Sequence, residues 1–217
     1  MSKSRRIKKF EKFSTEALNN SLRLHFDSIL LFNNNSFASA FHLNVLALEE
    51  IAKSDAIDHY IETTTTNHGL PNPDGDEEQK WIKFLYIHTK KHFAFINQQF
   101  HFLDKTFYDF AESSKLELKK QKSIYVGLER NRNKINTKSK ISSPNQIKEQ
   151  DAKKIISMNN QVLANQCIRN INNGFYYGPR EKYELMNKEL LNKLMKEWTY
   201  SSRLVEREKF NKRNNYQ

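Results

Sequence analysis

The stretch FASAFHLNVLALEEIAKSDAIDHYIETTTT, residues 37–66, decides the fold class of this chain. Its apolar residues recur at helical spacing, Ser36 can cap its start, and the β-branched threonines of residues 63–66 end the pattern. The stretch therefore predicts a long helix over about residues 37–63.

Four further segments of the sequence have helical patterns. The expected helices run from Ser14, a suitable N-cap, to the asparagines of residues 33–35; over about residues 78–110, which are rich in aromatic side chains; from about residue 147 to Gly174; and from Gly178 past Trp198.

Composition favours an all-α fold. The 217 residues include only 5 glycines and 4 prolines and contain no glycine-rich phosphate-binding motif, which argues against a doubly wound nucleotide-binding fold. We expect a bundle of about five to six helices. The polar and basic residues 115–147 should form a short helix or strand and a loop between the third and later helices.

The chain is expected to form one helical domain with charged ends. Residues 1–13 would be a basic arm, residues 14–175 the helical domain, and residues 176–217 a charged helical extension. The single cysteine, Cys167, cannot form an internal disulfide, and neither a signal peptide nor an apolar run of the ~20 residues that span a membrane is present. These features predict a cytoplasmic protein.

The net charge of +11 is unevenly distributed. Residues 14–114 hold 7 basic and 14 acidic side chains, whereas residues 115–154 hold 12 basic and 4 acidic ones. A basic surface attracts RNA and other polyanions, but basic ends also commonly serve to keep a protein in solution. Charge alone therefore does not identify a partner.

Glu49 is an ionisable residue that we expect inside the bundle. A helix turns about 100° per residue, so Val45 and Ala52 fall within about 60° of Glu49 on the quoted helix. Glu49 thus points from the middle of an apolar face. Lys53 lies on the same side, and Glu50 lies at the edge of that face.

Two other helices show the same pattern. On the aromatic-rich helix, several apolar side chains fall within about 60° of His88. On the first helix, Asn20, Arg23 and Asp27 share a face with leucines. All of these polar groups are therefore predicted to point toward the core.

Because unpaired buried charges are costly, these side chains are expected to meet in one polar cluster. In it, Arg23 and Lys53 would neutralise Asp27 and Glu49, and a carboxylate would fix the tautomer of His88. The cluster is either a structural network that sets helix register or a site where His88 and a carboxylate transfer protons. In a catalytic site, Lys53 or Arg23 would stabilise an anion.

A metal centre is not expected. His88 and His92 lie four residues apart, as metal-binding histidines on a helix do, but no H-E-x-x-H pattern is present. The sequence therefore predicts neither a metal nor a cofactor.

Several motifs, in order along the chain, resemble those of the AbiV family of bacterial abortive infection proteins. The resemblance covers roughly residues 14–165. The matching elements are Ala17, Asn20, Leu24 and Asp27 of the opening helix; the run from Ala47 to Lys53, which resembles an A-x-E-E-x-x-K helix; His88 with Lys91, which resembles H-x-x-K; and Lys122, Tyr125 and Val126, followed by Ser143 and Pro144.

The resemblance implies a HEPN-like helical homodimer that acts in phage defence. A phage protein or another phage-derived trigger would activate it, and it would then shut down host translation, with RNA or the ribosome as a further partner and no role for a membrane. The candidate catalytic residues are Glu49, Lys53 and His88; the supporting cluster is Asn20, Arg23, Asp27, Glu50 and Lys91; and the candidates for nucleic-acid or partner binding are Lys122, Tyr125, Arg130, Arg132 and Lys134.

One departure from the HEPN pattern leaves enzymatic activity open. Many HEPN relatives are metal-independent ribonucleases with an R-x(4–6)-H motif on a late helix. Here the run that begins at Arg130 starts similarly, but the last histidine of the chain is His101. Either any RNA cleavage uses the cluster of Glu49, Lys53 and His88, or the protein is a non-catalytic interaction module whose cluster is purely structural.

Overall fold

The computed structural model describes residues 3–67, 75–99, 115–128, 130–131, 134–173 and 179–200. These ranges contain eight α-helices, one 3-10 helix and one small β-hairpin, which confirms the expected all-α class. Within them, no helix is both long and apolar enough to cross a bilayer. The elements are α1 (Lys3–Asn33), α2 (Phe37–Asn67), α3 (Asp76–Phe84), α4 (His88–Gln99), α6 (Lys115–Lys122), β1 (Arg130–Asn131), β2 (Lys134–Ile135), η2 (Pro144–Gln146), α7 (Glu149–Asn173), α8 (Arg180–Leu185) and α9 (Lys188–Glu197).

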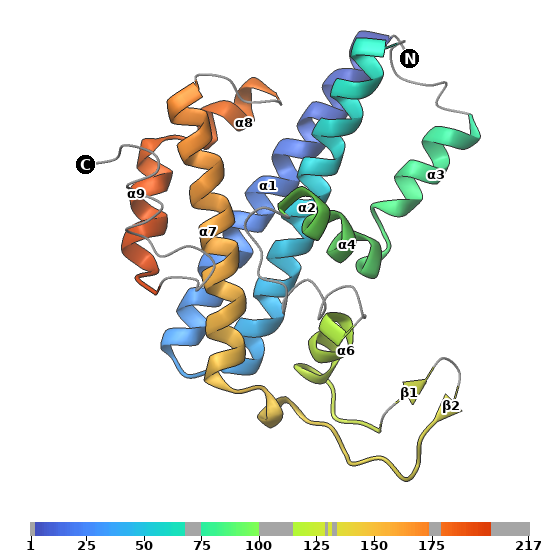
Figure 1. Cartoon of the computed structure of the whole chain (residues 1–217), viewed down its shortest axis with the longest axis vertical. Helices are drawn as coiled ribbons and strands as arrows, with labels where there is room; N and C mark the ends of the chain where they lie inside the picture. Colours follow the sequence, from blue (N-terminus) through green and yellow to red (C-terminus); the bar gives the residue numbers. More distant parts are fainter. Residues whose placement is uncertain are drawn as a thin grey trace.

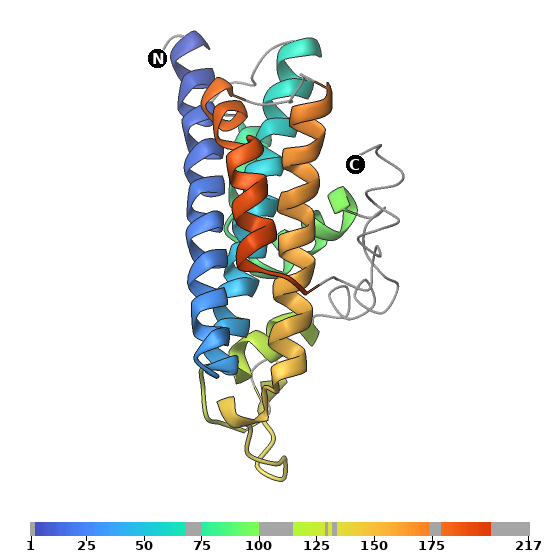
Figure 2. The same ribbon diagram turned by 90° about the vertical axis from the view of Figure 1, so that its left-hand side faces the viewer.

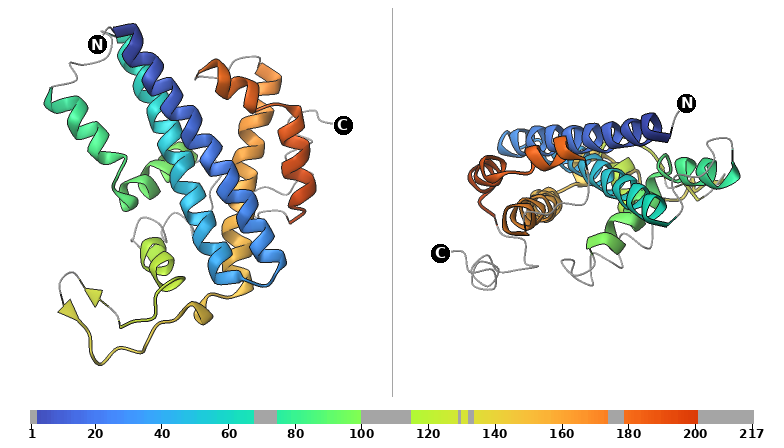
Figure 3. Two further views of the ribbon diagram at one scale, coloured as in Figure 1. Left: turned by 180° about the vertical axis from the view of Figure 1, so that it is seen from behind. Right: turned by 90° about the horizontal axis from the view of Figure 1, so that it is seen from above.

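Four helices form the body of the molecule. The long helices α1 and α2 run antiparallel, and α7 and α9 lie alongside them (Figures 1 and 2). Helices α3 and α4 lie on the other side of the α1–α2 pair from α7 and α9 (Figure 3). The main core lies among α1, α2 and α7, and Phe95 of α4 and Leu116 of α6 extend it.

Serines line the contact between α1 and α2. Ser14, Ser21 and Ser28 recur every seven residues and are fully buried. Ser21 Oγ donates to the Ala47 carbonyl oxygen at 3.0 Å, and Ser14 Oγ donates to Asp58 Oδ1 at 2.5 Å. Such small side chains let two helices approach closely, and here the hydroxyl groups also satisfy buried polar atoms.

The expected start of the first helix at Ser14 is wrong. Helix α1 begins at Lys3, so Ser14 lies inside the helix, where its hydroxyl bonds to α2 and does not cap a helix end. Residues 3–13 of the expected basic arm are thus helical. Arg6 in this segment pairs with Glu78 of α3.

The asparagines end α1 as predicted. Asn35 adopts φ 60°, and the backbone N–H of Ser36 donates to the Leu31 carbonyl at 2.9 Å, which closes the helix in a left-handed C-terminal turn. Helix α2 begins at Phe37, as expected, but continues past the predicted end near residue 63. In this added turn, threonine hydroxyls donate to carbonyls one turn earlier, as Thr65 Oγ1 does to Ile61 at 2.6 Å.

The expected single helix over residues 78–110 is interrupted. Helix α3 ends at Phe84 and α4 begins at His88, with the buried Leu85 in the turn between them. The turn lets Trp81 stack on Tyr60 of α2, with ring centroids 3.9 Å apart, while the axis of α4 runs in a different direction from that of α3 (Figure 1). This break comes from tertiary packing, and residues 100–110 lie outside the described ranges.

Helices α8 and α9 lie in the segment expected as a C-terminal extension, yet Met186, Leu194 and Trp198 belong to the main core. The predicted single last helix is two helices, because the Asn187 side chain accepts from the Leu190 N–H at 2.9 Å and starts α9. Lys182 of α8 is fully buried.

A buried polar ladder joins α1, α2 and α7 around His25. His25 Nε2 donates to Asn160 Oδ1 at 3.0 Å, and Asn44 Nδ2 donates to His25 Nδ1 at 3.0 Å. Asn159 Nδ2 in turn donates to Asn44 Oδ1 at 2.7 Å. Burial lowers the pKa of His25 to about 4, so the imidazole is neutral in the folded protein at neutral pH.

Candidate functional site

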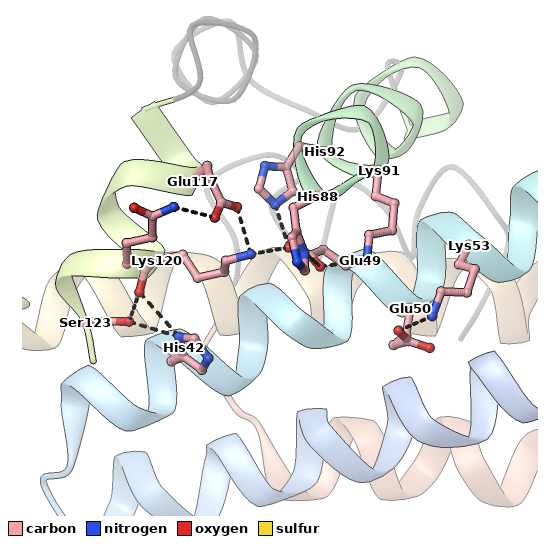
Figure 4. Close-up of polar contacts among 11 residues, drawn as sticks. His42, Glu49, Glu50, Lys53, His88, Lys91, His92, Glu117, Lys120 and Ser123 are labelled. Carbon is pink, nitrogen blue, oxygen red and sulfur yellow. Dashed lines mark hydrogen bonds and ion pairs between the residues drawn. The ribbon is translucent and has the colours of Figure 1, made fainter. Parts of the chain in front are cut away.

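Glu49, in the middle of α2, is the centre of a buried ionic cluster (Figure 4). Its carboxylate is 1% exposed. Oε2 lies 2.6 Å from His88 Nδ1 and 2.9 Å from Lys91 Nζ, and Oε1 lies 3.0 Å from His92 Nε2 and 2.7 Å from Lys120 Nζ. Helix α4 supplies three of these groups and α6 supplies the fourth, so one side chain of α2 joins three helices.

The sequence spacing explains why α4 contributes three partners. His88, Lys91 and His92 lie at positions i, i+3 and i+4, which share one face of a helix. Phe95 follows on the same face and is fully buried in the core, which holds this face of α4 against α2.

The surroundings keep Glu49 ionised. Burial alone would raise the pKa of Glu49, but hydrogen bonds from His92 and Lys120 and the charges of Lys120 and Lys91 outweigh burial and hold the pKa well below its ordinary value. A carboxylate in this state does not accept a proton near neutral pH. Glu49 can therefore orient its partners but cannot serve as a general base.

His88 lies at the edge of the cluster. Its side chain is 52% exposed, whereas that of His92 is fully buried. With Nδ1–H donating to Glu49, the neutral imidazole has its acceptor at Nε2. A histidine that is oriented by a buried carboxylate and open to solvent has the arrangement of a general acid–base group.

Lys120 links Glu49 to a second carboxylate. Its Nζ lies 2.7 Å from Glu117 Oε2, and Glu117 Oε1 accepts from Gln121 Nε2 at 3.0 Å. Glu49, His92 and Glu117 form a group whose potential metal-ligand atoms lie within 4.8 Å of one another. Carboxylates and an imidazole are suitable ligands for a divalent metal ion.

The polar cluster extends to His42 of α2. Its Nδ1 lies 3.2 Å from Ser123 Oγ and 3.3 Å from the Lys120 carbonyl oxygen, where it can donate a hydrogen bond. Burial lowers the pKa of His42. This contact holds the end of α6 against α2.

The expected role of Lys53 in neutralising Glu49 is wrong. Lys53 Nζ pairs with Glu50 at 2.5 Å, and both side chains are half-buried, apart from the cluster (Figure 4). Glu49 already has four donors from α4 and α6, so its neutralising charges come from other helices. Of the three candidate catalytic residues, the structure brings together Glu49 and His88, with the supporting candidate Lys91.

The inward orientation expected for Asn20, Arg23 and Asp27 is also wrong. Arg23 and Asp27 form an ion pair of 3.1 Å with side chains 62% and 47% exposed, and Arg23 Nη2 donates to Asn20 Oδ1 at 2.9 Å. The buried serines define the inner face of α1, so this trio lies on its surface.

Sequence reasoning did not identify three members of the cluster: His92, Glu117 and Lys120. His92 could have been identified, because it lies one turn from His88 and shares its face. Glu117 and Lys120 lie in a short basic helix without a clear apolar pattern, so no local signal places them against α2.

The basic segment, residues 115–147, forms an irregular surface beside the cluster. Tyr125 is exposed and Lys122 is half-buried; Arg130 begins β1 and Lys134 begins β2, while Arg132 lies outside the described residues. A surface depression of about 300 Å³ lies between α6 and η2. Its lining residues are Lys115, Leu118, Lys119, Lys122, Gln146 and Ile147.

The chain matches a known protein family. A family model described as AbiV, of the HEPN type, matches residues 9–164, which include most of α1, all of α2, the Glu49 cluster and most of α7. No curated protein and no solved structure matches the chain. Because the match covers well over half of the sequence, the chain belongs to the AbiV family of HEPN-type abortive infection proteins.

Proposed function

We propose that this protein is a cytoplasmic effector of abortive infection that a phage-derived component activates and that then arrests host translation by acting on RNA. Family membership supports the role in phage defence. The observation that carries the proposal for RNA is the half-exposed His88 held by buried Glu49 at 2.6 Å. A homodimer, as the family resemblance implies, is part of the proposal.

In the proposed reaction, His88 acts on the RNA backbone. Its Nε2 takes the proton of a ribose 2′-hydroxyl, and the 2′ oxygen attacks the adjacent phosphorus. The bond to the 5′ oxygen of the next nucleotide breaks, and that oxygen takes a proton from water; the imidazolium of His88 then returns its proton to the hydroxide that remains. The products are a cyclic phosphate and a 5′-hydroxyl, and the reaction needs no metal ion. Glu49 keeps its negative charge throughout and stabilises the imidazolium that forms.

The basic segment is the proposed RNA-binding surface. Lys115 and Lys122 line the depression beside α6, and Tyr125 offers an exposed ring on which a base can stack. Arg130, Arg132 and Lys134 of the following segment would add positive charge along the RNA backbone.

A non-catalytic interaction module is the second candidate function. It is favoured by the complete pairing of Glu49, since each carboxylate oxygen contacts one imidazole and one ammonium group, the ammonium groups being those of Lys91 and Lys120. In this alternative the cluster only fixes α4 and α6 on α2, and translation arrest follows from binding.

The deciding experiment compares His88→Asn with wild type. Arg23→Gln serves as the control, because Arg23 is an exposed residue away from the cluster. Thermal unfolding shows whether each variant is folded. Plaque formation on expressing cells measures protection, and pulse labelling of RNA and protein after infection identifies the arrested process. Purified protein is then incubated with total RNA and phage lysate.

Three outcomes distinguish the alternatives. Loss of protection and of discrete RNA cleavage by a His88→Asn variant that remains folded supports the proposed reaction. Intact RNA with halted protein synthesis in the wild type contradicts cleavage and supports arrest by binding. Full protection by the folded variant shows that His88 has no role in function.

A further inference from the structure

The Lys120 ammonium lies between two carboxylates. Its Nζ is 2.7 Å from Glu49 Oε1 and 2.7 Å from Glu117 Oε2, and the side chain is almost fully buried. The imidazole of His92, also buried, lies beside them with Nε2 at 3.0 Å from the same Glu49 oxygen. Two acids and one imidazole thus surround a single cation (Figure 4).

These three side chains are a suitable ligand set for a divalent transition metal ion. Two carboxylate oxygens and one imidazole nitrogen match the preferences of Zn²⁺ and Mn²⁺, and the ligand atoms already lie within 4.8 Å of one another. Each ligand comes from a different helix, since Glu49 is on α2, His92 on α4 and Glu117 on α6.

The site also has bonding capacity that Lys120 does not use. His92 Nδ1 is buried and has no hydrogen-bond partner within the described part of the chain. Glu117 Oε2 contacts Lys120 as an ion pair, but within the same residues it accepts no well-aligned hydrogen bond. Buried polar atoms of this kind usually have a partner.

We propose that Lys120 is the built-in cation of a site that, without its ammonium group, binds a divalent transition metal ion such as Zn²⁺. An ammonium group and a metal ion cannot occupy the same position, so the wild-type chain keeps the site closed to metal. Removing the ammonium leaves the buried carboxylate of Glu49 facing the half-buried carboxylate of Glu117, and a divalent ion restores the balance of charge. This inference does not depend on the proposed action on RNA.

The test is Zn²⁺ binding by Lys120→Ala, measured by isothermal titration calorimetry, with Co²⁺ absorption as a second probe of coordination. The variant should bind one Zn²⁺ ion, gain visible Co²⁺ bands and rise in melting temperature on adding Zn²⁺. The wild type should show none of these effects. If Lys120→Ala is unfolded without metal, Zn²⁺ should restore its helical circular dichroism, because metal binding and folding are coupled.

Lys91→Ala is the matched control. It removes a different ammonium from Glu49, the one 2.9 Å from Oε2, but leaves Lys120 between the two carboxylates. This variant should gain no Zn²⁺ binding. Adding Glu117→Gln or His92→Ala to Lys120→Ala should weaken Zn²⁺ binding by at least about tenfold, because each removes a ligand.

Several results would overturn the proposal. One is a Lys120→Ala protein that binds Zn²⁺ no more tightly than wild type or Lys91→Ala. Another is an unfolded Lys120→Ala protein that Zn²⁺ does not refold. Zn²⁺ binding that persists unchanged in both double variants would show that the ion binds elsewhere.

Discussion

The ammonium of Lys182 lies 2.5 Å from Asp58 Oδ2, although 124 positions separate the two residues. Lys182 belongs to α8, beyond the residues that match the AbiV family, whereas Asp58 lies on α2 within them. Ser54 Oγ accepts from the same ammonium at 2.6 Å, and Asp55 Oδ1 lies 3.6 Å away. The C-terminal helices therefore supply the cation for two carboxylates of the family domain.

Replacing Lys182 with methionine should destabilise the protein strongly. Burial raises the pKa of both Asp55 and Asp58, and without Lys182 the two carboxylates would lose the ammonium they share. We expect a loss of about 3–5 kcal/mol in the free energy of unfolding, measured by urea denaturation. Asp58→Asn should lower the free energy of unfolding by less, because the carboxylate of Asp55 still neutralises the charge of Lys182.

Arg180→Gln is the control within the same helix. Arg180 forms an exposed ion pair with Glu184, and loss of such a pair should cost about 0.5 kcal/mol or less. A Lys182→Met protein as stable as Arg180→Gln would show that the buried ion cluster does not hold α8 in place.

Glu49→Gln should change the acid sensitivity of the fold. The folded-state pKa of Glu49 lies below its ordinary value of 4.5, so its ionised form stabilises the protein above that pH, and this stabilisation is lost as the pH falls below it. The difference in unfolding free energy between wild type and Glu49→Gln should therefore be large at pH 7 and shrink on acidification. A difference that stays constant down to about pH 3 would contradict this account.

His25 should make the unfolding free energy depend on pH in a second range, at higher pH than the range set by Glu49. Its pKa falls from 6.5 to about 4 on folding, so the unfolded chain binds more protons between these values and stability decreases as the pH falls through this window. Across this whole window the unfolding free energy should fall by about 3 kcal/mol. In His25→Gln the unfolding free energy should vary less with pH over that range. The difference in unfolding free energy between the two proteins at pH 7.5, where His25 is neutral in the folded and unfolded states, measures the loss of packing separately from the effect of titration.

Cys167 should be unreactive in the folded protein. Burial raises the pKa of its thiol to about 12, and its Sγ packs 3.6 Å from the Met186 sulfur. Ellman's reagent at pH 8 should therefore modify it only after unfolding, when the single thiol of the chain reacts fully. Stoichiometric modification of the native protein within minutes would show that α8 and α9 detach readily from α7.

The sequence predicted the helices with strong local signals. The boundary between α1 and α2 follows from the asparagine run, where Asn35 takes the left-handed conformation. The position of Glu49 on the inner face of α2 follows from helical periodicity alone. By contrast, the break between α3 and α4 contains no glycine or proline, and only the packing of Trp81 and Leu85 reveals it.

The errors at the site have one physical cause. On α1, leucines suggested the inner face, and Leu24 is buried, but Leu30 is exposed, and the inner face combines apolar core residues such as Leu18 with buried serines, which hydropathy does not identify as buried. Periodicity places a residue on a face of its own helix. Periodicity does not indicate which other helix packs on that face, and so Lys120 of α6 could not be assigned as a partner of Glu49.

The two tryptophans of the chain lie in different settings. Trp81 stacks on Tyr60 and contacts Phe10 at the junction of α1, α2 and α3. Trp198 is buried after α9, with its indole N–H donating to Ser157 Oγ at 2.9 Å. Single-tryptophan variants would therefore give two separate fluorescence signals, so that undocking of α3 and release of the C-terminal helices could be followed independently.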